Sequence, residues 1–260
     1  MKKIKNIVDK KNKSKIVCLT AYSKNIAEEV DKHVDIILVG DSLGSVLYNY
    51  SSTKKVTLTE MINHSKSVRL GIKKSLMVVD MPFKTYSTKT LALKNSKKIL
   101  KETKCDAVKL EGGKRVVEQI KFLIKNKIPV MGHIGLLPQS TKKFKSKGKT
   151  NSEIKNLISD AMMLQESGVF AIVLECVKTE IAKLITQKLN IPTIGIGSSV
   201  YCDGQVLVTD DLIGLNHTNI KFVKRFSNVK KYINVGIRKY ASDVRKKNTL
   251  QKNILIRNIF

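Results

Sequence analysis

The sequence predicts a (β/α)8 barrel, the TIM-barrel fold, and three observations support this prediction. The chain has 260 residues, which is the ordinary length of one such barrel. Short apolar runs alternate with stretches whose apolar residues recur at helical spacing, the pattern of parallel strands joined by helices. Several runs end on a carboxylate, a histidine or a lysine, and in a barrel all strand ends open onto one face. We therefore expect one domain over residues 1–260, with a short N-terminal arm and a C-terminal helix.

Eight short apolar runs are the strand candidates, because a parallel strand that is buried on both faces is expected to be almost continuously apolar. In chain order they are Ile16–Leu19, Ile36–Val39, Leu76–Val79, Ala107–Leu110, Val130–Ile134, Ala171–Leu174, Thr193–Ile196 and Gln205–Val208. Pro129 and Pro192 precede two of these runs, at positions where a missing backbone N–H is tolerated. Eight strand–helix units favour closure of the sheet into a barrel.

Amphipathic stretches between these runs predict the helices. They cover Ser23–His33, Leu58–Leu70, Lys114–Asn126, Asn151–Ser167 and Thr179–Leu189. Gly168 is suited to ending the fourth of these, since glycine readily adopts the left-handed conformation that follows many helices. We expect residues 1–14 to close the bottom of the barrel, residues 227–247 to form a helix and residues 141–149 to form a polar loop.

The composition excludes several classes of protein. Apolar residues make up 42% of the chain, which is too many for a disordered protein. No run approaches the ~18 apolar residues of a membrane span, and no apolar segment of a secretory signal follows the basic N-terminus, so we expect no membrane partner. The four cysteines form no CxxC pair, which argues against a zinc site or a disulfide framework and fits a reducing cytoplasm.

The net charge is +28, from 49 Lys and Arg residues against 21 Asp and Glu residues. Such a balance is compatible with a nucleic-acid-binding protein. Most of these cations are lysines, however, and they are distributed along the whole chain, while aromatic residues that could stack on bases are scarce. We therefore interpret the charge as a solvated surface that attracts anions, and we predict small-molecule substrates and no specific nucleic-acid partner.

Acidic residues follow three of the predicted strands. Asp41 comes shortly after Ile36–Val39, Asp80 comes directly after Leu76–Val79, and Glu111 follows the fourth run. Carboxylates at neighbouring strand ends can reach one hard cation such as Mg²⁺, which takes one or two carboxylates together with substrate and water oxygens. The alternative is that each aspartate caps the helix that follows it. Three acids at successive strand ends favour the metal site.

Lys109, His133 and Glu175 are further candidates at strand ends. Lys109 lies two residues before Glu111, so both side chains point into the barrel mouth, where an ammonium group suits an anionic substrate or a developing enolate. A surface ion pair is the alternative. His133 lies between glycines and is expected to bind substrate or act as an acid–base group, although a lone histidine is usually structural. Glu175 follows an apolar run, which suits a general base; a structural acid paired with lysine is the alternative.

Seven blocks of sequence, taken together, resemble the ketopantoate hydroxymethyltransferase family. They are Val39–Gly44 (VGDSLG), Asp80–Phe83 (DMPF), Val108–Gly113 (VKLEGG), Gly132–Ser140 (GHIGLLPQS), Leu174–Val177 (LECV), Ile194–Gly197 (IGIG) and Asp203–Val208 (DGQVLV). They occur in the family's order and at close to its spacing, over about residues 15–245. Each block alone is ambiguous, whereas the set is specific.

The resemblance implies a (β/α)8 barrel of the phosphoenolpyruvate/pyruvate superfamily type. It also implies transfer of a one-carbon unit from 5,10-methylenetetrahydrofolate to 3-methyl-2-oxobutanoate (α-ketoisovalerate), giving ketopantoate in the first committed step of pantothenate synthesis. The family's cofactor is Mg²⁺, and its assembly is a ring-like homo-oligomer, a decamer. A cytoplasmic location is expected.

The roles of individual residues follow from the resemblance at matching positions. Asp41 and Asp80 would hold Mg²⁺ and the bound keto acid, and Glu111 would lie at the metal directly or through water. The other matching positions are the substrate-binding residues Ser42 and Lys109 and the proton acceptor Glu175.

The chain departs from the family pattern in three places. Ser23 stands where the family usually has Asp, Tyr48–Tyr50 and Lys54-Lys55 replace an acid and Leu-Pro, and Lys142–Thr150 replaces a longer loop with glycine and tyrosine. Two alternatives were weighed against the transferase. One is a carbon–carbon lyase of the same superfamily acting on a 2-oxo or 2-hydroxy acid, but the cysteine-bearing loop of those enzymes is not evident here. The other is a degenerate barrel that binds polyanions through its lysines.

Overall fold

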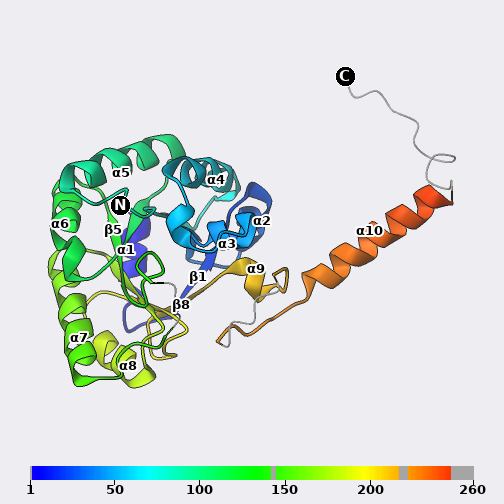
Figure 1. Cartoon of the computed structure of the whole chain (residues 1–260). Helices are drawn as coiled ribbons and strands as arrows, with labels where there is room; N and C mark the ends of the chain where they lie inside the picture. The colour runs from blue at the N-terminus through cyan, green and yellow to red at the C-terminus, as the bar shows by residue number, and fades with distance from the viewer. Residues whose placement is uncertain (1, 142–144, 217–221, 247–260) are drawn as a thin grey trace. The chain divides into compact units, whose positions relative to one another are not determined.

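The computed structural model describes residues 2–141, 145–216 and 222–246 (Figure 1). The chain divides into two compact units, Met1–Thr209 and Asp210–Phe260, and each is described by itself. In the first unit, eight parallel strands form a closed barrel in which each strand pairs with the next and β8 pairs with β1. The fold predicted from the sequence is therefore confirmed.

The strands coincide with the eight apolar runs. Their bounds are β1 Ile16–Thr20, β2 Ile36–Val39, β3 Leu76–Asp80, β4 Ala107–Glu111, β5 Val130–Gly135, β6 Ala171–Glu175, β7 Thr193–Ile196 and β8 Gly204–Leu207. Asp80, Glu111 and Glu175 are the last residues of β3, β4 and β6 rather than the first residues of loops. The hydrogen bonding of the sheet therefore fixes the backbone of all three acids.

Helices surround the barrel (Figure 1). The first unit contains α1 Lys2–Val8, α2 Lys24–Val30, α3 Leu43–Tyr48, α4 Leu58–Gly71, α5 Lys89–Thr103, α6 Val117–Lys125, α7 Asn151–Glu166 and α8 Thr179–Lys188, with the 3-10 turns η1 Thr53–Lys55 and η2 Lys114–Val116. Helix α9, Thr209–Leu212, lies where the two units meet in the sequence, and α10 spans Val229–Arg245 in the second unit.

Helix α5 was not among the predicted helices, and the reason lies in what it buries. Three of its five buried residues are polar: Asn95, Ser96 and Thr103. Only two of its buried residues, Ala92 and Ile99, are apolar, so its buried face is not recognisable as an apolar stripe in the sequence. The predicted helix over 114–126 was correct in position but begins as the 3-10 turn η2.

The core has two layers because alternate strand residues point to opposite faces of the sheet. Ile36 and Leu38 of β2 belong to a cluster inside the barrel, whereas Ile37 and Val39 belong to the larger cluster between the sheet and the helices. Ile7 of α1 packs into the inner cluster. Helix α1 therefore closes the bottom of the barrel, as the sequence predicted.

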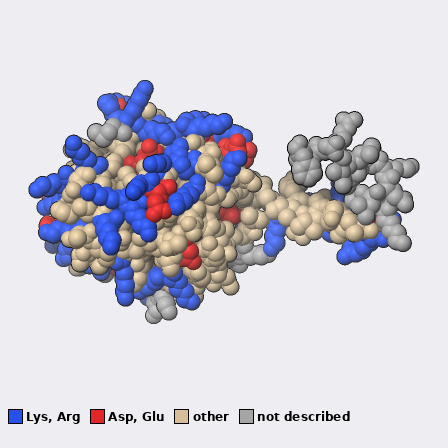
Figure 2. Space-filling model, turned by 90° about the horizontal axis from the view of Figure 1, so that it is seen from above, with Lys and Arg blue, Asp and Glu red and all other residues tan. Residues whose placement is uncertain are grey.

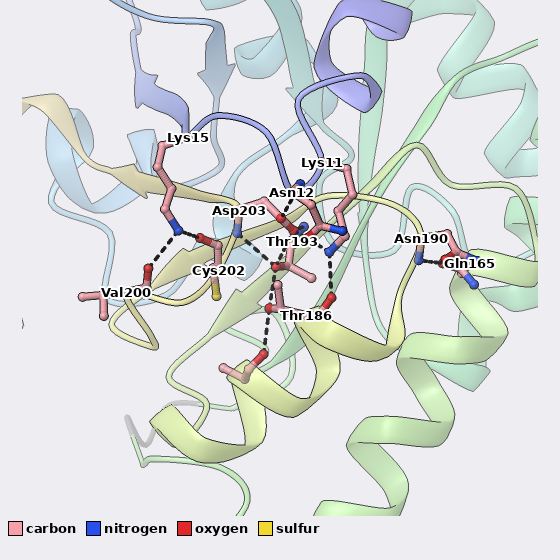
Figure 3. Close-up of polar contacts among 11 residues, drawn as sticks. Lys11, Asn12, Lys15, Gln165, Thr186, Asn190, Thr193, Val200, Cys202 and Asp203 are labelled. Atoms are coloured by element: carbon pink, nitrogen blue, oxygen red, sulfur yellow. Dashed lines mark hydrogen bonds and ion pairs between the residues drawn. The ribbon is translucent and has the colours of Figure 1, made fainter.

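A polar network lies at the N-terminal ends of the strands (Figure 3). The Lys11 Nζ atom is 2.8 Å from Asp203 Oδ2 and 2.7 Å from the Thr186 carbonyl oxygen, and Lys11 and Asp203 are 8% and 6% exposed. Asp203 also accepts the backbone N–H of Thr193 at 2.9 Å and that of Asn12 at 3.4 Å. These bonds attach the segment after α1 to the start of β7 and β8.

The surface of the first unit carries the charge expected from the sequence. Lys and Arg side chains spread over the face seen in Figure 2 without gathering over one element. Among the described residues, no helix is both long and apolar enough to cross a membrane. The four cysteines are buried as free thiols. His33 is exposed, and His217 lies outside the described residues.

Candidate active site

The C-terminal ends of the strands bring the predicted site residues to one rim of the barrel. Strand register places Asp80 of β3 beside Lys109 of β4, and Glu111 of β4 beside His133 of β5. All four of these residues are buried. Asp41, which follows β2, is buried with them. Acids that are far apart in the sequence therefore meet at one place, as the metal-site hypothesis requires.

Asp41 and Asp80 lie against each other. The backbone N–H of Asp41 donates to Asp80 Oδ2 at 3.1 Å, and the Lys109 Nζ donates to Asp80 Oδ1 at 2.7 Å. Neither aspartate caps a helix: α3 begins after Ser42, and the N-cap of α5 is Thr88. The capping alternative is therefore wrong, and both carboxylates face the site.

His133 lies between two carboxylates. Its Nε2 is 3.2 Å from Glu175 Oε2, and its Nδ1 is 3.9 Å from Glu111 Oε2. The histidine side chain is only 3% exposed, and the Glu175 side chain is 12% exposed. Within the described residues, neither ring nitrogen makes a hydrogen bond of good geometry. Buried polar atoms normally have a hydrogen-bond partner, so the ring nitrogens of His133 are suited to bind a ligand at this site.

The site contains more carboxylates than cationic side chains, and this affects their pKa values. Burial, and then the charge of Asp80, raise the pKa of Asp41 from 3.8 to about 7, against the opposing effects of Lys109 and Gln139. Burial, and then the charge of Asp41, raise the pKa of Glu111 from 4.5 to about 9. Burial alone would lower the pKa of Lys109, but Asp80 and Asp41 outweigh it, so the pKa lies above its ordinary value and the ammonium stays charged.

This excess of buried carboxylate fits a hard divalent cation, because such an ion would neutralise it. Over the part of the chain that the structure describes, no three or more His, Cys, Asp and Glu residues form a complete ligand set. The fit is therefore to a cation that takes two protein carboxylates and completes its shell with substrate and water oxygens, as Mg²⁺ commonly does.

Gln139 and Tyr86 are site residues that the sequence reasoning did not single out. The buried Gln139 side chain donates to Asp41 Oδ2 at 2.8 Å and to the Met81 carbonyl oxygen at 3.0 Å. Its backbone N–H donates to Glu111 Oε1 at 2.9 Å, and its own Oε1 accepts the Tyr86 hydroxyl at 2.5 Å. The sequence feature that could have indicated Gln139 is the Pro138-Gln139 pair, which comes shortly after the end of the fifth predicted strand.

Ser42 lies at the edge of the same group, with its Oγ 2.8 Å from the Tyr22 hydroxyl. His64, on α4, connects Tyr22 and Tyr48. Its Nδ1 is 2.7 Å from the Tyr22 carbonyl oxygen, and its Nε2 is 2.7 Å from the Tyr48 hydroxyl. These contacts give His64 a structural role. Ser42 remains open to a ligand because it is only half-buried.

The loop between β5 and α7 is fixed at both ends. Near its start, Gln139 is bound to Asp41 and Glu111. Near its end, the Lys147 N–H donates to the Cys176 carbonyl oxygen at 2.8 Å, and the Lys178 N–H donates to the Lys147 carbonyl oxygen at 3.0 Å. The second anchor lies directly after β6, next to the strand end that carries the expected proton acceptor.

Comparisons with known proteins identify the family of the chain. A family model described as ketopantoate hydroxymethyltransferase matches residues 1–249. The chain belongs to this family. The 3-methyl-2-oxobutanoate hydroxymethyltransferase of Pelagibacter ubique (strain HTCC1062) is 64% identical over 243 residues, covering 94% of this chain and 95% of that protein. The enzyme of the same name from Anaplasma marginale (strain St. Maries) is 48% identical over 246 residues, covering 92% and 89%.

Solved structures with the same fold are distant in sequence. Phosphoenolpyruvate phosphomutase from Streptomyces platensis subsp. rosaceus has a TM-score of 0.64 and 10% identity, covering 95% of this chain and 88% of that one. A 2,3-dimethylmalate lyase of the PEP mutase/isocitrate lyase superfamily has a TM-score of 0.62 and 10% identity, covering 97% and 87%. Phosphonopyruvate hydrolase, solved with oxalate and Mg²⁺, has a TM-score of 0.59 and 10% identity, covering 100% and 93%. These likenesses confirm the expected type of barrel for this ketopantoate hydroxymethyltransferase family member.

Proposed function

We propose that the protein transfers a hydroxymethyl group from 5,10-methylenetetrahydrofolate to 3-methyl-2-oxobutanoate, forming ketopantoate for pantothenate biosynthesis. The observation that carries this proposal is the group of three buried carboxylates, the partly buried Glu175 and one buried lysine at the barrel rim, in a chain of this family. A small anionic keto acid fits such a site only if positive charge accompanies it, and Lys109 together with a divalent cation would supply that charge.

The residues best placed to hold Mg²⁺ are Asp41 and Asp80, with Glu111 next to the ion directly or through water. When bound, the cation supplies Lewis acidity toward the ketone and carboxylate oxygens of the keto acid, which makes its C3 hydrogen more acidic. Ser42 and His133 offer hydrogen bonds to the substrate, since the first is half-buried at the rim and the second has unsatisfied ring nitrogens.

Glu175 is the proposed proton acceptor. The C3–H bond breaks, the proton passes to the Glu175 carboxylate, and the charged Lys109 ammonium stabilises the negative charge that develops on the substrate. The His133 Nε2 atom lies 3.2 Å from Glu175 Oε2, so a substrate bound to the histidine would lie close to this carboxylate. C3 then bonds to the methylene carbon of the folate, and both C–N bonds of that methylene break. Water provides the hydroxyl oxygen of the product, and the proton taken from C3 and one proton of the water end on the two freed folate nitrogens.

The test separates the two halves of the reaction. In D2O, the protein with 3-methyl-2-oxobutanoate should exchange the C3 hydrogen for deuterium only when Mg²⁺ is present, as followed by proton NMR. Addition of 5,10-methylenetetrahydrofolate should then yield ketopantoate. No exchange at saturating Mg²⁺ would overturn the proposal. Cleavage of a 2-hydroxy acid without folate would favour the superfamily lyase instead.

The resemblance further supports a cytoplasmic, ring-like homo-oligomer with small-molecule substrates as its partners. Light scattering of the purified protein at physiological salt would give the mass of the assembly. A monomer under these conditions, or tight and sequence-specific DNA binding, would contradict this part of the proposal.

A further inference from the structure

Gln139 connects two of the site's carboxylates through two different parts of one residue. Its side-chain nitrogen donates to Asp41 Oδ2 at 2.8 Å, and its backbone N–H donates to Glu111 Oε1 at 2.9 Å. The side chain is buried and comes from the loop after β5, whereas the two acids come from the ends of β2 and β4. A neutral donor therefore lies between two acids that repel each other.

The orientation of the Gln139 amide is determined by its surroundings. Asp41 Oδ2 and the Met81 carbonyl oxygen are both acceptors, so the NH2 group must face them. The amide oxygen then faces the Tyr86 hydroxyl, which donates to it. All of the hydrogen-bonding groups of the side chain are thus in use within the protein. Gln139 can influence the reaction only through the residues that it holds.

We propose that Gln139 is a positioning residue that keeps Asp41 and Glu111 in the arrangement needed to bind the divalent cation, and that Tyr86 keeps Gln139 in place. The inference rests on the proposed function for the role of the cation. Without the side-chain amide, Asp41 loses the donor at its Oδ2, while the backbone N–H of residue 139 still reaches Glu111. The repulsion between the two acids is then less well balanced. Groups that orient metal ligands in this way typically change metal affinity by about 10- to 100-fold.

A purely structural role makes a different prediction. Gln139 also bonds to the backbone of the β3–α5 loop, at Met81. If its only role were to attach one loop to another, its loss would lower stability and leave the cation affinity of the folded protein unchanged. Cation affinity, measured apart from turnover, therefore distinguishes the two roles.

The test is Gln139→Met, which keeps the length of the side chain and removes its hydrogen bonds. The matched control is Gln165→Met at the opposite end of the barrel, where the Gln165 Oε1 accepts the Asn190 N–H at 2.6 Å (Figure 3). Mn²⁺ binding is measured by electron paramagnetic resonance. We expect a Kd about tenfold higher for Gln139→Met and unchanged for the control. Deuterium exchange should require more Mg²⁺ but recover much of its rate at saturation.

A second variant, Tyr86→Phe, removes the anchor of the amide while leaving both donors of Gln139 in place, so a smaller rise in Kd is expected. Folded Gln139→Met with wild-type Mn²⁺ affinity would overturn the inference, as would wild-type affinity in Tyr86→Phe if Gln139→Met does not fold. If the wild-type protein itself neither binds Mn²⁺ nor exchanges the C3 hydrogen, the proposed function fails instead.

Discussion

Both ends of the barrel bury charged side chains, but the two ends differ in how completely those side chains are paired. At the N-terminal face, Lys11 and Asp203 form a buried ion pair, and backbone groups fill the remaining hydrogen-bonding positions of the aspartate (Figure 3). At the C-terminal rim, Lys109 pairs with Asp80, while Asp41 and Glu111 have no ion pair with a lysine or arginine among the described residues. The His133 ring nitrogens lack well-formed hydrogen bonds within the same residues. Complete pairing stabilises a fold, whereas incomplete pairing indicates a site that binds something else.

The largest loss of activity is expected from a substitution that removes only the proposed proton acceptor at the rim. Glu175→Gln keeps the size of the side chain and removes its ability to accept a proton. We expect deuterium exchange at C3 to fall about 10³-fold, while binding of the keto acid, measured by calorimetry, stays near the wild-type value. Exchange at the wild-type rate would assign the base to another residue.

The same substitution at each end of the barrel should have opposite effects. Asp203→Asn leaves the buried Lys11 ammonium without its counter-charge, so the free energy of unfolding should fall by about 3 kcal/mol with little change in Mn²⁺ affinity. Asp41→Asn relieves repulsion from Asp80, so stability should hold or rise while Mn²⁺ affinity falls at least about 100-fold. Denaturant melts and Mn²⁺ titrations of both variants would test this. If both variants lose stability and keep their Mn²⁺ affinity, the two ends of the barrel do not differ in the way proposed.

The rim should also make stability depend on pH. The raised pKa values, about 7 for Asp41 and about 9 for Glu111, mean that the folded state holds these protons more tightly than the unfolded chain does. Their stabilising contribution is therefore complete below the ordinary carboxylate pKa of about 4 and is lost as the pH rises through 7 and then 9. Without metal, the Tm of the wild-type protein should fall between pH 5 and 9 by more than the Tm of Asp41→Asn does. Added Mg²⁺ should restore the wild-type Tm, and most strongly at high pH. A flat difference between the two proteins would contradict this.

The smallest expected effect is at the edge of the rim. Ser42→Ala removes one hydroxyl and its 2.8 Å contact with the Tyr22 hydroxyl, but no charge. A hydrogen bond to a charged substrate group is worth about a tenfold change in KM. The KM for 3-methyl-2-oxobutanoate should rise by about this factor with kcat nearly unchanged, as steady-state kinetics would show. A lower kcat at constant KM would mean that Ser42 acts in the transition state instead.

Sequence reasoning was sufficient for the residues whose position depends on strand periodicity. Asp80, Glu111 and Glu175 were recognisable because each ends an apolar run, and the closed barrel then brings such ends together. Gln139 and Tyr86 were not recognisable, because they reach the site from loops whose path no periodicity describes. The raised pKa values of Asp41 and Glu111 were also beyond the sequence, since they depend first on how deeply each carboxylate is buried and then on the distances between the carboxylates.

The N-terminal network shows a second limit of the sequence. The atoms that pair Lys11 with Asp203 belong to residues that are 192 positions apart. A lysine in a chain with 49 Lys and Arg residues carries no local sign that it will be buried. Helix α5 illustrates the same difficulty, since its buried face contains polar residues that resemble a surface.

The anchoring of the β5–α7 loop at Gln139 and at Lys147 has an evolutionary consequence. The stretch between these two points can lengthen, shorten or change its composition while the chemistry on either side stays where it is. From the resemblance, we expect the chain to depart from its family pattern here, with the short lysine-rich segment Lys142–Thr150 in place of a longer glycine- and tyrosine-containing one. If the proposed function holds, sequence changes between the two anchors are expected to alter the response to the second substrate while the strand-end residues proposed to bind the first keep their positions.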